Sequence, residues 1–161
     1  MRSILREKSQ DYFSILQHDR SEWMTFWKQY LIEHREIMNG YVEQFALDSV
    51  KTGEIFKDTT RPFLDQIKQK NDEIKHLKQK ASKTLNRFSK ELELTKEDFV
   101  IYLIGALGIQ DVVTFESEER LIVLIDIVSL YKNNRIEQLQ EIVLLSAQNA
   151  RKTLNQKQEV F

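Results

Sequence analysis

The scarcity of glycine and proline constrains the fold of this chain most. Among 161 residues there are only 4 Gly and 1 Pro, whereas an average protein carries roughly 12% of the two together. Glycine supplies the positive φ angles of tight turns and proline interrupts helices, so a chain poor in both favours long helices joined by few turns. Because 41% of the residues are hydrophobic, we expect a folded domain rather than a disordered segment.

The absence of cysteine excludes several kinds of site. A chain with no Cys cannot form disulfides, thiolate zinc sites, iron–sulfur clusters or a cysteine nucleophile. The sequence contains no apolar run of the roughly 18 residues that a membrane helix needs, and its first eight residues lack the apolar segment of a secretion signal. We therefore expect a cytoplasmic protein that has no cofactor and no membrane partner.

Apolar residues at helical spacing dominate the first part of the chain. Between residues 22 and 48 they recur at every third or fourth position, which is typical of an amphipathic helix. Ser21 is the expected N-cap of this helix. Residues 3–18 have a less regular pattern that also favours a helix, so the sequence predicts two antiparallel helices here.

Aromatic side chains are concentrated in these two segments. Trp23, Trp27 and Tyr30 form a stripe at helical spacing. Such a stripe could offer a stacking surface for a ligand, but at this spacing aromatic residues more commonly fill a core. We expect a structural role for all three.

A third helix is predicted over residues 61–94. Residues 51–53 read as a break before it, and the segment 59–62, with its threonines and Pro62, carries helix start signals. Within the helix, apolar residues repeat at intervals of seven, as in a coiled coil: Ile67, Ile74, Ala81 and Phe88. Polar residues interrupt the companion positions, so we expect this coiled-coil-like helix to pack inside its own bundle rather than across a dimer.

Short β-branched runs follow in the middle of the chain. Residues 99–104, 112–115 and 120–125 are rich in Val and Ile, which favours three strands, the last two forming a hairpin. The alternative is helical, because Thr95 with Asp98 fits a capping box and residues 117–119 fit a helix start. We favour the strands.

These elements together predict an α+β, predominantly helical fold. An N-terminal helical bundle spans about residues 3–94, a small β element about 99–126, and a C-terminal helix about 136–156. An all-α bundle is the alternative. We expect one globular domain over residues 1–161, with a helical part (1–95) and a small mixed part (96–161).

Positive charge is concentrated in the third helix. Residues 61–90 contain nine basic and three acidic residues, so 9 − 3 = +6 for this segment leaves −7 for the rest of a chain whose net charge is −1. A basic face could contact an acidic partner or phosphate groups. The expected contact residues are Lys68, Lys75, Lys78, Lys83 and Arg87.

Motifs for catalysis or metal binding are lacking in the sequence. The three histidines have no HExxH or HxxxH spacing, and Glu73 with His76 makes one ExxH where a di-iron bundle needs two. Gly105 and Gly108 are spaced as in the GXXG loop of KH domains, but no basic residue accompanies them to hold a phosphate. We predict no catalytic residue and no metal site.

The C-terminal part resembles one enzyme class in the order of its elements. An apolar strand, a hairpin and then the helix over residues 139–154 resemble the core of zinc peptidases that carry HExxH in that helix. Here the corresponding segment reads Ala147-Gln148-Asn149-Ala150-Arg151, without ligands or a general base. The resemblance implies a degenerate, inactive metallopeptidase-like domain.

Three functions therefore remain open from the sequence. The first is a non-catalytic protein-interaction or scaffold module, whose partner is another protein or a second copy of the chain. The second is binding of nucleic acid or an acidic partner through the basic helix. The third is the inactive peptidase-like domain. We favour the protein-interaction module.

Overall fold

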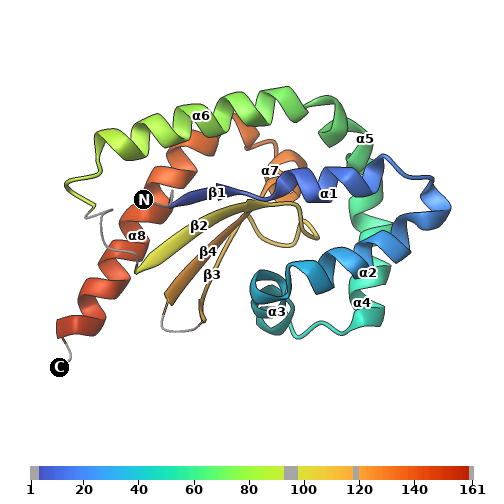
Figure 1. The fold of residues 1–161 in the computed structure, drawn as a ribbon, viewed down its shortest axis with the longest axis horizontal. Helices are drawn as coiled ribbons and strands as arrows, with labels where there is room; N and C mark the ends of the chain where they lie inside the picture. The colour runs from blue at the N-terminus through green and yellow to red at the C-terminus, as the bar shows by residue number, and fades with distance from the viewer. Residues whose placement is uncertain (1–3, 93–97, 118–119, 160–161) are drawn as a thin grey trace.

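The computed structural model describes residues 4–92, 98–117 and 120–159. A four-stranded sheet lies at the centre, and helices cover it from both sides (Figure 1). The fold is α+β and predominantly helical, as the sequence predicts, and the sheet rules out the all-α alternative. Among the described residues, no helix combines the length and the apolar character needed to cross a membrane.

Eight α-helices and four strands make up the described part of the chain. The helices are α1 (Ser9–Leu16), α2 (Trp23–Glu33), α3 (Arg35–Gln44), α4 (Ser49–Ile55), α5 (Arg61–Gln69), α6 (Asn71–Arg87), α7 (Ile127–Lys132) and α8 (Leu139–Glu159). The strands are β1 (Leu5–Glu7), β2 (Phe99–Ile104), β3 (Val112–Ser117) and β4 (Arg120–Asp126). A π-helical turn precedes α5, and 3-10 turns precede α2 and α8.

The predicted helix over residues 22–48 is two helices. The chain leaves helical geometry at His34 (φ −110°, ψ 30°), which separates α2 from α3. The apolar spacing continues across this break, so the pattern alone does not reveal it. The prediction of Ser21 as an N-cap is wrong, because Ser21 lies inside the 3-10 turn Arg20–Glu22 and its hydroxyl donates to Asp19.

The predicted break at residues 51–53 is also wrong, because these residues lie within α4. The Asp48 carboxylate accepts a hydrogen bond from the Lys51 N–H at 2.8 Å and caps this helix.

The predicted helix over residues 61–94 is also two helices. It divides at Lys70 into α5 and α6, and α6 ends at Arg87. Residues 93–94 lie outside the described residues.

Three of the four heptad residues of the third helix are core residues, and the fourth, Phe88, is partly buried just after α6 ends. Ile67, Ile74 and Ala81 are fully buried. The helix α6 packs against α8 of the same chain, and the Gln140 side chain on α8 donates to the Thr84 hydroxyl on α6 at 2.6 Å. The packing predicted within the chain's own bundle is therefore present.

The sheet has the order β1-β2-β4-β3. The three strands β1, β2 and β4 are parallel, and β3 pairs antiparallel with β4. The three predicted strands are confirmed, and so is the antiparallel pairing of the last two. The rival helix start at residues 117–119 is wrong, because Ser117 ends β3 and residues 120–126 form β4; Thr95, Glu118 and Glu119 themselves lie outside the described residues.

The strand β1 was not predicted, since residues 3–18 read as a helix. It has only three residues, too few to show a period of two. Its pairing with β2 places Leu5 opposite Ile101, and Arg6 donates to the Tyr102 hydroxyl at 3.1 Å. The first residues of the chain are thus part of the sheet.

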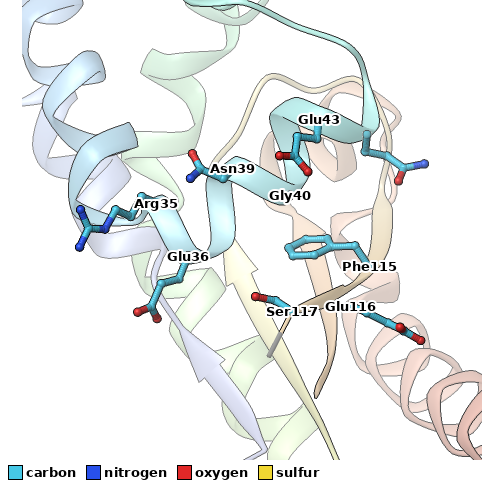
Figure 2. A pocket seen from close by; sticks show the side chains of 9 residues that line it. Arg35, Glu36, Asn39, Gly40, Glu43, Phe115, Glu116 and Ser117 are labelled. Atoms are coloured by element: carbon cyan, nitrogen blue, oxygen red, sulfur yellow. The ribbon is translucent and has the colours of Figure 1, made fainter. Parts of the chain in front are cut away.

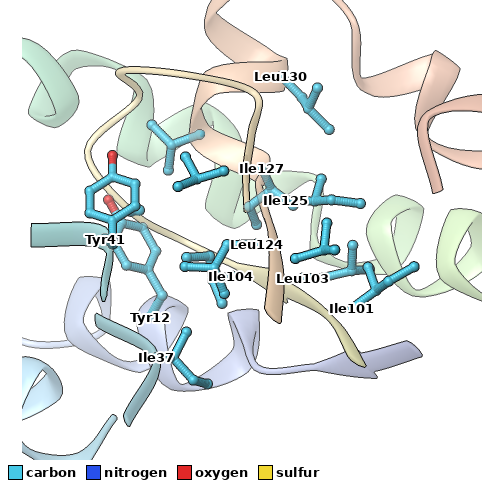
Figure 3. Packing of buried hydrophobic residues seen from close by; sticks show 14 of the residues in the cluster. Tyr12, Ile37, Tyr41, Ile101, Leu103, Ile104, Leu124, Ile125, Ile127 and Leu130 are labelled. Carbon is cyan, nitrogen blue, oxygen red and sulfur yellow. The ribbon is translucent and has the colours of Figure 1, made fainter. Parts of the chain in front are cut away.

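Alternation along the strands assigns side chains to two faces. Phe99, Val123 and Val112 point to the face that α8 covers, and Phe115 points to the opposite face, towards α3. Residues from both faces and from the helices form one buried cluster, part of which Figure 3 shows. The sheet therefore separates two helical layers.

The aromatic stripe of α2 belongs to this core. Trp23, Trp27 and Tyr30 are all buried, which confirms their predicted structural role. The Trp27 ring is 1% exposed and stacks on Phe56 with 4.8 Å between ring centroids. It also contacts Tyr12 edge-on at 6.2 Å.

We predict that Trp27→Ala lowers the free energy of unfolding by about 3–5 kcal/mol, because it leaves a cavity in the core. Chemical denaturation followed by circular dichroism measures this loss. Replacement of the exposed Ile32 on the same helix by alanine is the control, with an expected loss below about 1 kcal/mol. Equal losses for the two variants would contradict a core role for Trp27.

Candidate functional site

A buried carboxylate organises the carboxyl ends of the parallel strands. Asp126, the last residue of β4, is 1% exposed. Its Oδ1 accepts hydrogen bonds from the N–H groups of Ala106 and Val128 at 3.0 Å each, and its Oδ2 accepts one from Gly108 at 2.8 Å. One side chain thus caps α7 and holds the loop that follows β2.

Tyrosine hydroxyls surround the same loop. Tyr30 donates to the Gly105 carbonyl at 2.9 Å, and the Leu107 N–H donates to the Tyr41 hydroxyl at 3.3 Å. The Tyr12 hydroxyl is buried and has no hydrogen-bond partner among the described residues. The loop with the GXXG spacing is therefore buried and bonded internally, which is unlike a loop that presents its backbone to phosphate.

Burial is the largest influence on the pKa values of Asp126 and Tyr30. It raises the pKa of Asp126 from 3.8 to about 6, although the amides of Gly108, Ala106 and Val128 favour the charged form. Burial also raises the pKa of Tyr30 well above its ordinary value. The sequence analysis did not single out Asp126. The signal that could have identified it is an acidic residue directly after an apolar strand and directly before a helix, where a carboxylate commonly caps the helix.

His34 lies outside this cluster. Its Nε2 is 2.9 Å from the Asp11 carboxylate, and its ring packs against Tyr30 with centroids 4.8 Å apart. An open groove of about 300 Å³ beside it is lined by Asp11, Tyr30 and Glu33 but not by His34. The imidazole is thus placed for a structural contact between α1 and the end of α2.

The helix α8 carries structural residues in its segment 147–151. Ala147 and Ala150 are buried. Arg151 is 5% exposed; its Nε donates to the Leu92 carbonyl at 2.9 Å and its guanidinium lies 3.3 Å from Asp98. Within the described ranges, no three His, Asp or Glu side chains lie together in an arrangement that could hold a metal ion.

The basic residues of α6 are at the periphery of the molecule. The helix runs along the outside of the fold (Figure 1). Four exposed residues, His76, Lys80, Lys83 and Arg87, follow one another at intervals of four, three and four. Since successive helical residues turn by about 100°, these four share one stripe. We call them the α6 stripe.

The structure distributes the predicted contact residues over more than one face. Lys83 and Arg87 belong to the α6 stripe, and Lys75 is exposed beside it. Lys78 is half-buried and lies about 140° around the helix from Lys83. Lys68 is exposed on α5, beyond the bend at residue 70. The predicted contact residues did not include Lys80, although its spacing of three and seven residues from Lys83 and Arg87 places it on the same helical face.

The α6 stripe has no intramolecular counter-charge. Among the residues that the structure describes, no carboxylate lies within ion-pair distance of Lys80, Lys83 or Arg87. Lys70, before the helix, is paired with Glu73 at 3.2 Å. The stripe is thus available to an external anion or acidic surface.

Two grooves flank the edge strand β3, one on each face of the sheet. The first, of about 580 Å³, lies between α3 and β3, and we call it the α3 groove (Figure 2). It is lined by Arg35, Glu36, Asn39, Gly40, Glu43, Gln44, Phe115, Glu116 and Ser117. The second, of about 240 Å³, lies between β3 and α8, and we call it the α8 groove. It is lined by Val112, Thr114, Arg135, Ile142, Leu145, Ser146, Asn149, Ala150 and Thr153.

The helix α3 approaches β3 very closely at Gly40. A Cβ atom there would lie 2.3 Å from the Phe115 ring, so the close approach requires glycine. Figure 2 shows the Phe115 ring under α3, with Glu36 and Glu43 on either side along the helix. Phe115 therefore forms the floor of the α3 groove.

Comparisons of the chain with protein-family models, with curated proteins and with solved structures found no match.

We predict that Tyr30→Phe lowers the free energy of unfolding by about 1–3 kcal/mol, because it leaves the buried Gly105 carbonyl without its donor. Tyr12→Phe is the matched control, since the Tyr12 hydroxyl has no partner among the described residues; its expected change is below about 1 kcal/mol. Thermal and urea denaturation measure both. A larger loss for Tyr12→Phe would contradict this assignment of hydrogen bonds.

We also predict a stability contribution from Asp126 that depends on pH. Its pKa is higher in the folded chain (about 6) than the ordinary 3.8, so folding favours the protonated form. This contribution is fully present below about pH 4 and is lost as the pH rises through 6. Two pKa units correspond to about 3 kcal/mol.

The measurement compares the wild type with Asp126→Asn by urea denaturation between pH 4 and pH 7. The amide does not titrate, and it turns a donor towards the Gly108 N–H, so the variant is less stable throughout. The difference in free energy of unfolding should shrink as the pH rises. A difference that stays constant or grows with pH would refute the raised pKa of Asp126.

Proposed function

We propose that this chain is a non-catalytic protein-interaction module that binds an acidic partner protein through the α6 stripe. The observation that carries this proposal is the exposure of Lys80, Lys83 and Arg87 on one helical face, without a carboxylate within ion-pair distance of them in the described part of the chain. The opposite face of α6 is buried against α8. The stripe is thus held on a rigid element, which favours a defined docking geometry.

The polar groups at the carboxyl ends of the strands support a non-catalytic role. Both oxygens of Asp126 accept backbone hydrogen bonds, and Tyr30 donates to the backbone as well. A general base needs a free lone pair within reach of a substrate proton. Asp126 is out of reach of a substrate, because it is 1% exposed and both of its oxygens already accept backbone hydrogen bonds.

Charge distribution favours a protein over nucleic acid as the partner. The segment 61–90 has a charge of +6, and the rest of the chain has −7. A long polyanion that extends beyond α6 meets this excess of negative charge, whereas a partner protein can present an acidic patch limited to the stripe. The segment also contains only two arginines, the residues that read bases in most specific contacts.

The test is capture of partners from a nuclease-treated cell extract by three forms of the full chain. These are the wild type, the stripe variant Lys80→Glu/Lys83→Glu/Arg87→Glu, and the control Lys28→Glu/Lys51→Glu/Lys57→Glu. The control changes the net charge equally at exposed lysines elsewhere. We expect proteins bound by the wild type and the control to be lost from the stripe variant, because like charges repel an acidic surface.

Binding to a panel of DNA and RNA oligonucleotides distinguishes the alternative. We expect weak binding without sequence preference near physiological salt, since log affinity for phosphates falls steeply with log salt. The same proteins captured by all three forms would contradict the proposal. Tight oligonucleotide binding that the stripe variant abolishes would replace the acidic protein with nucleic acid as partner.

A further inference from the structure

The strand β3 presents unpaired backbone groups at the edge of the sheet. β4 lies on one side of it and no strand on the other, within the described residues. The Asp126 N–H donates to the Asp111 carbonyl at 2.9 Å, which sets the antiparallel hydrogen-bond register. In this register every second residue bonds to β4, and the N–H and C=O of Thr114 and Glu116 point outward.

The described structure leaves these outward groups without partners. No described residue donates to or accepts from the backbone of Thr114 or Glu116 on that side. The next outward carbonyl, of Val112, accepts from the Gln110 side chain at 2.7 Å. Such a free edge is a template for another strand.

Grooves on both sides of β3 can receive the side chains of such a strand. An added strand directs successive side chains to opposite faces of the sheet. On one face they would enter the α3 groove, above Phe115. On the other they would enter the α8 groove, beside Val112, Ile142 and Leu145. Edge pairing with pockets for alternate side chains is the basis of peptide recognition by strand addition.

The two grooves differ in chemistry. In the α3 groove, Glu36 and Glu43 are exposed, and among the described residues no cation lies within ion-pair distance of either, Arg35 of the same lining included. Glu116 is already paired with Lys157 on α8. In the α8 groove, Leu145 is 56% exposed beside the nearly buried Ile142. The first groove thus suits a cationic side chain over an aromatic ring, and the second suits an apolar one.

We propose that β3 binds an extended peptide as an antiparallel fifth strand, with basic side chains in the α3 groove and apolar side chains in the α8 groove. Antiparallel pairing is the more stable arrangement per residue. The apolar residues lie opposite Thr114 and Glu116, on the same face, and exchange hydrogen bonds with them. The basic residues between them lie beside Phe115, and their own N–H groups point away from β3.

Charge makes a second copy of this chain a poor occupant. Pairing of two β3 edges about a two-fold axis places both α3 grooves on the same side of one continuous sheet. Glu36 and Glu43 of the two copies would then face each other, with Arg35 the only basic lining residue of each groove, so the carboxylates outnumber the cations and pairing costs free energy. This site is separate from the α6 stripe, so the proposal goes beyond the function proposed above.

The probe is a fluorescein-labelled peptide, Val-Lys-Val-Lys-Val-Lys-Val, acetylated and amidated at its ends and titrated with the full chain by fluorescence anisotropy. Two methylated peptides provide the sharpest comparison. In the first peptide, methyl groups on the backbone nitrogens of the valines block the N–H groups that face β3. In the second, methyl groups on the backbone nitrogens of the lysines lie on the edge that points away from β3. We expect the first to lose affinity by about tenfold or more and the second to retain it, since tenfold corresponds to one hydrogen bond of about 1.4 kcal/mol.

Variants of the protein test each contact in turn. Glu36→Lys/Glu43→Lys should weaken binding by about tenfold or more, because two attractions become repulsions. The control Glu33→Lys/Glu54→Lys changes the same charge at exposed positions on other helices and should leave binding unchanged. Thr114→Pro removes an outward N–H without removing a bond to β4, so it should weaken the peptide complex and preserve the circular dichroism spectrum.

Three outcomes would overturn the proposal. Equal affinity for both methylated peptides would show that the backbone edge of β3 is not used. Equal weakening by the two charge variants would show that only the overall charge matters. A dimer in size-exclusion chromatography that Thr114→Pro dissociates would make a second copy the occupant. The stripe variant of α6 should bind the peptide like the wild type, so failure here is distinguishable from failure of the acidic-partner proposal.

Discussion

Three backbone amides share the carboxylate of Asp126, two from the loop after β2 and one from the first turn of α7. A buried N–H that loses its acceptor costs about 1–3 kcal/mol, so the conformation of both segments depends on this side chain. Tyr30 and Tyr41 fix the same loop from α2 and α3. In parallel sheets the carboxyl ends of the strands commonly hold a ligand. Here they hold the protein's own backbone.

The strength and length of each apolar pattern decided which elements could be predicted. The six-residue run Phe99–Ile104 is long enough to identify a strand, whereas the three residues Leu5–Glu7 are not. Helix breaks are harder to find, because the apolar period of α2 continues through His34 into α3. At α4, the predicted break relied on Gly53, while the Asp48 cap that starts the helix carried the stronger signal.

Surface sites were predictable only where neighbours in sequence are neighbours in space. The basic character of α6 is local, and helical rotation separates Lys78 from the stripe that Lys80, Lys83 and Arg87 form. The α3 groove brings Glu36 next to Phe115, which is far along the chain. The one local sign of that contact was Gly40, since a glycine within a helix commonly marks a close approach. Nothing in the sequence indicated the partner of that glycine.

The short strand β1 also has a consequence for synthesis. Arg6 pairs with Tyr102, 96 positions later, and ribosomes add about 5–20 residues per second. The first strand is therefore synthesised roughly 5 to 20 seconds before its neighbour in the sheet. Helices α1 to α6 are made during that interval, before the loop after β2 that packs on Tyr12 and the helix α8 that packs on α6. Until β2 and β4 arrive, this nascent half exposes the kind of apolar surface that chaperones bind.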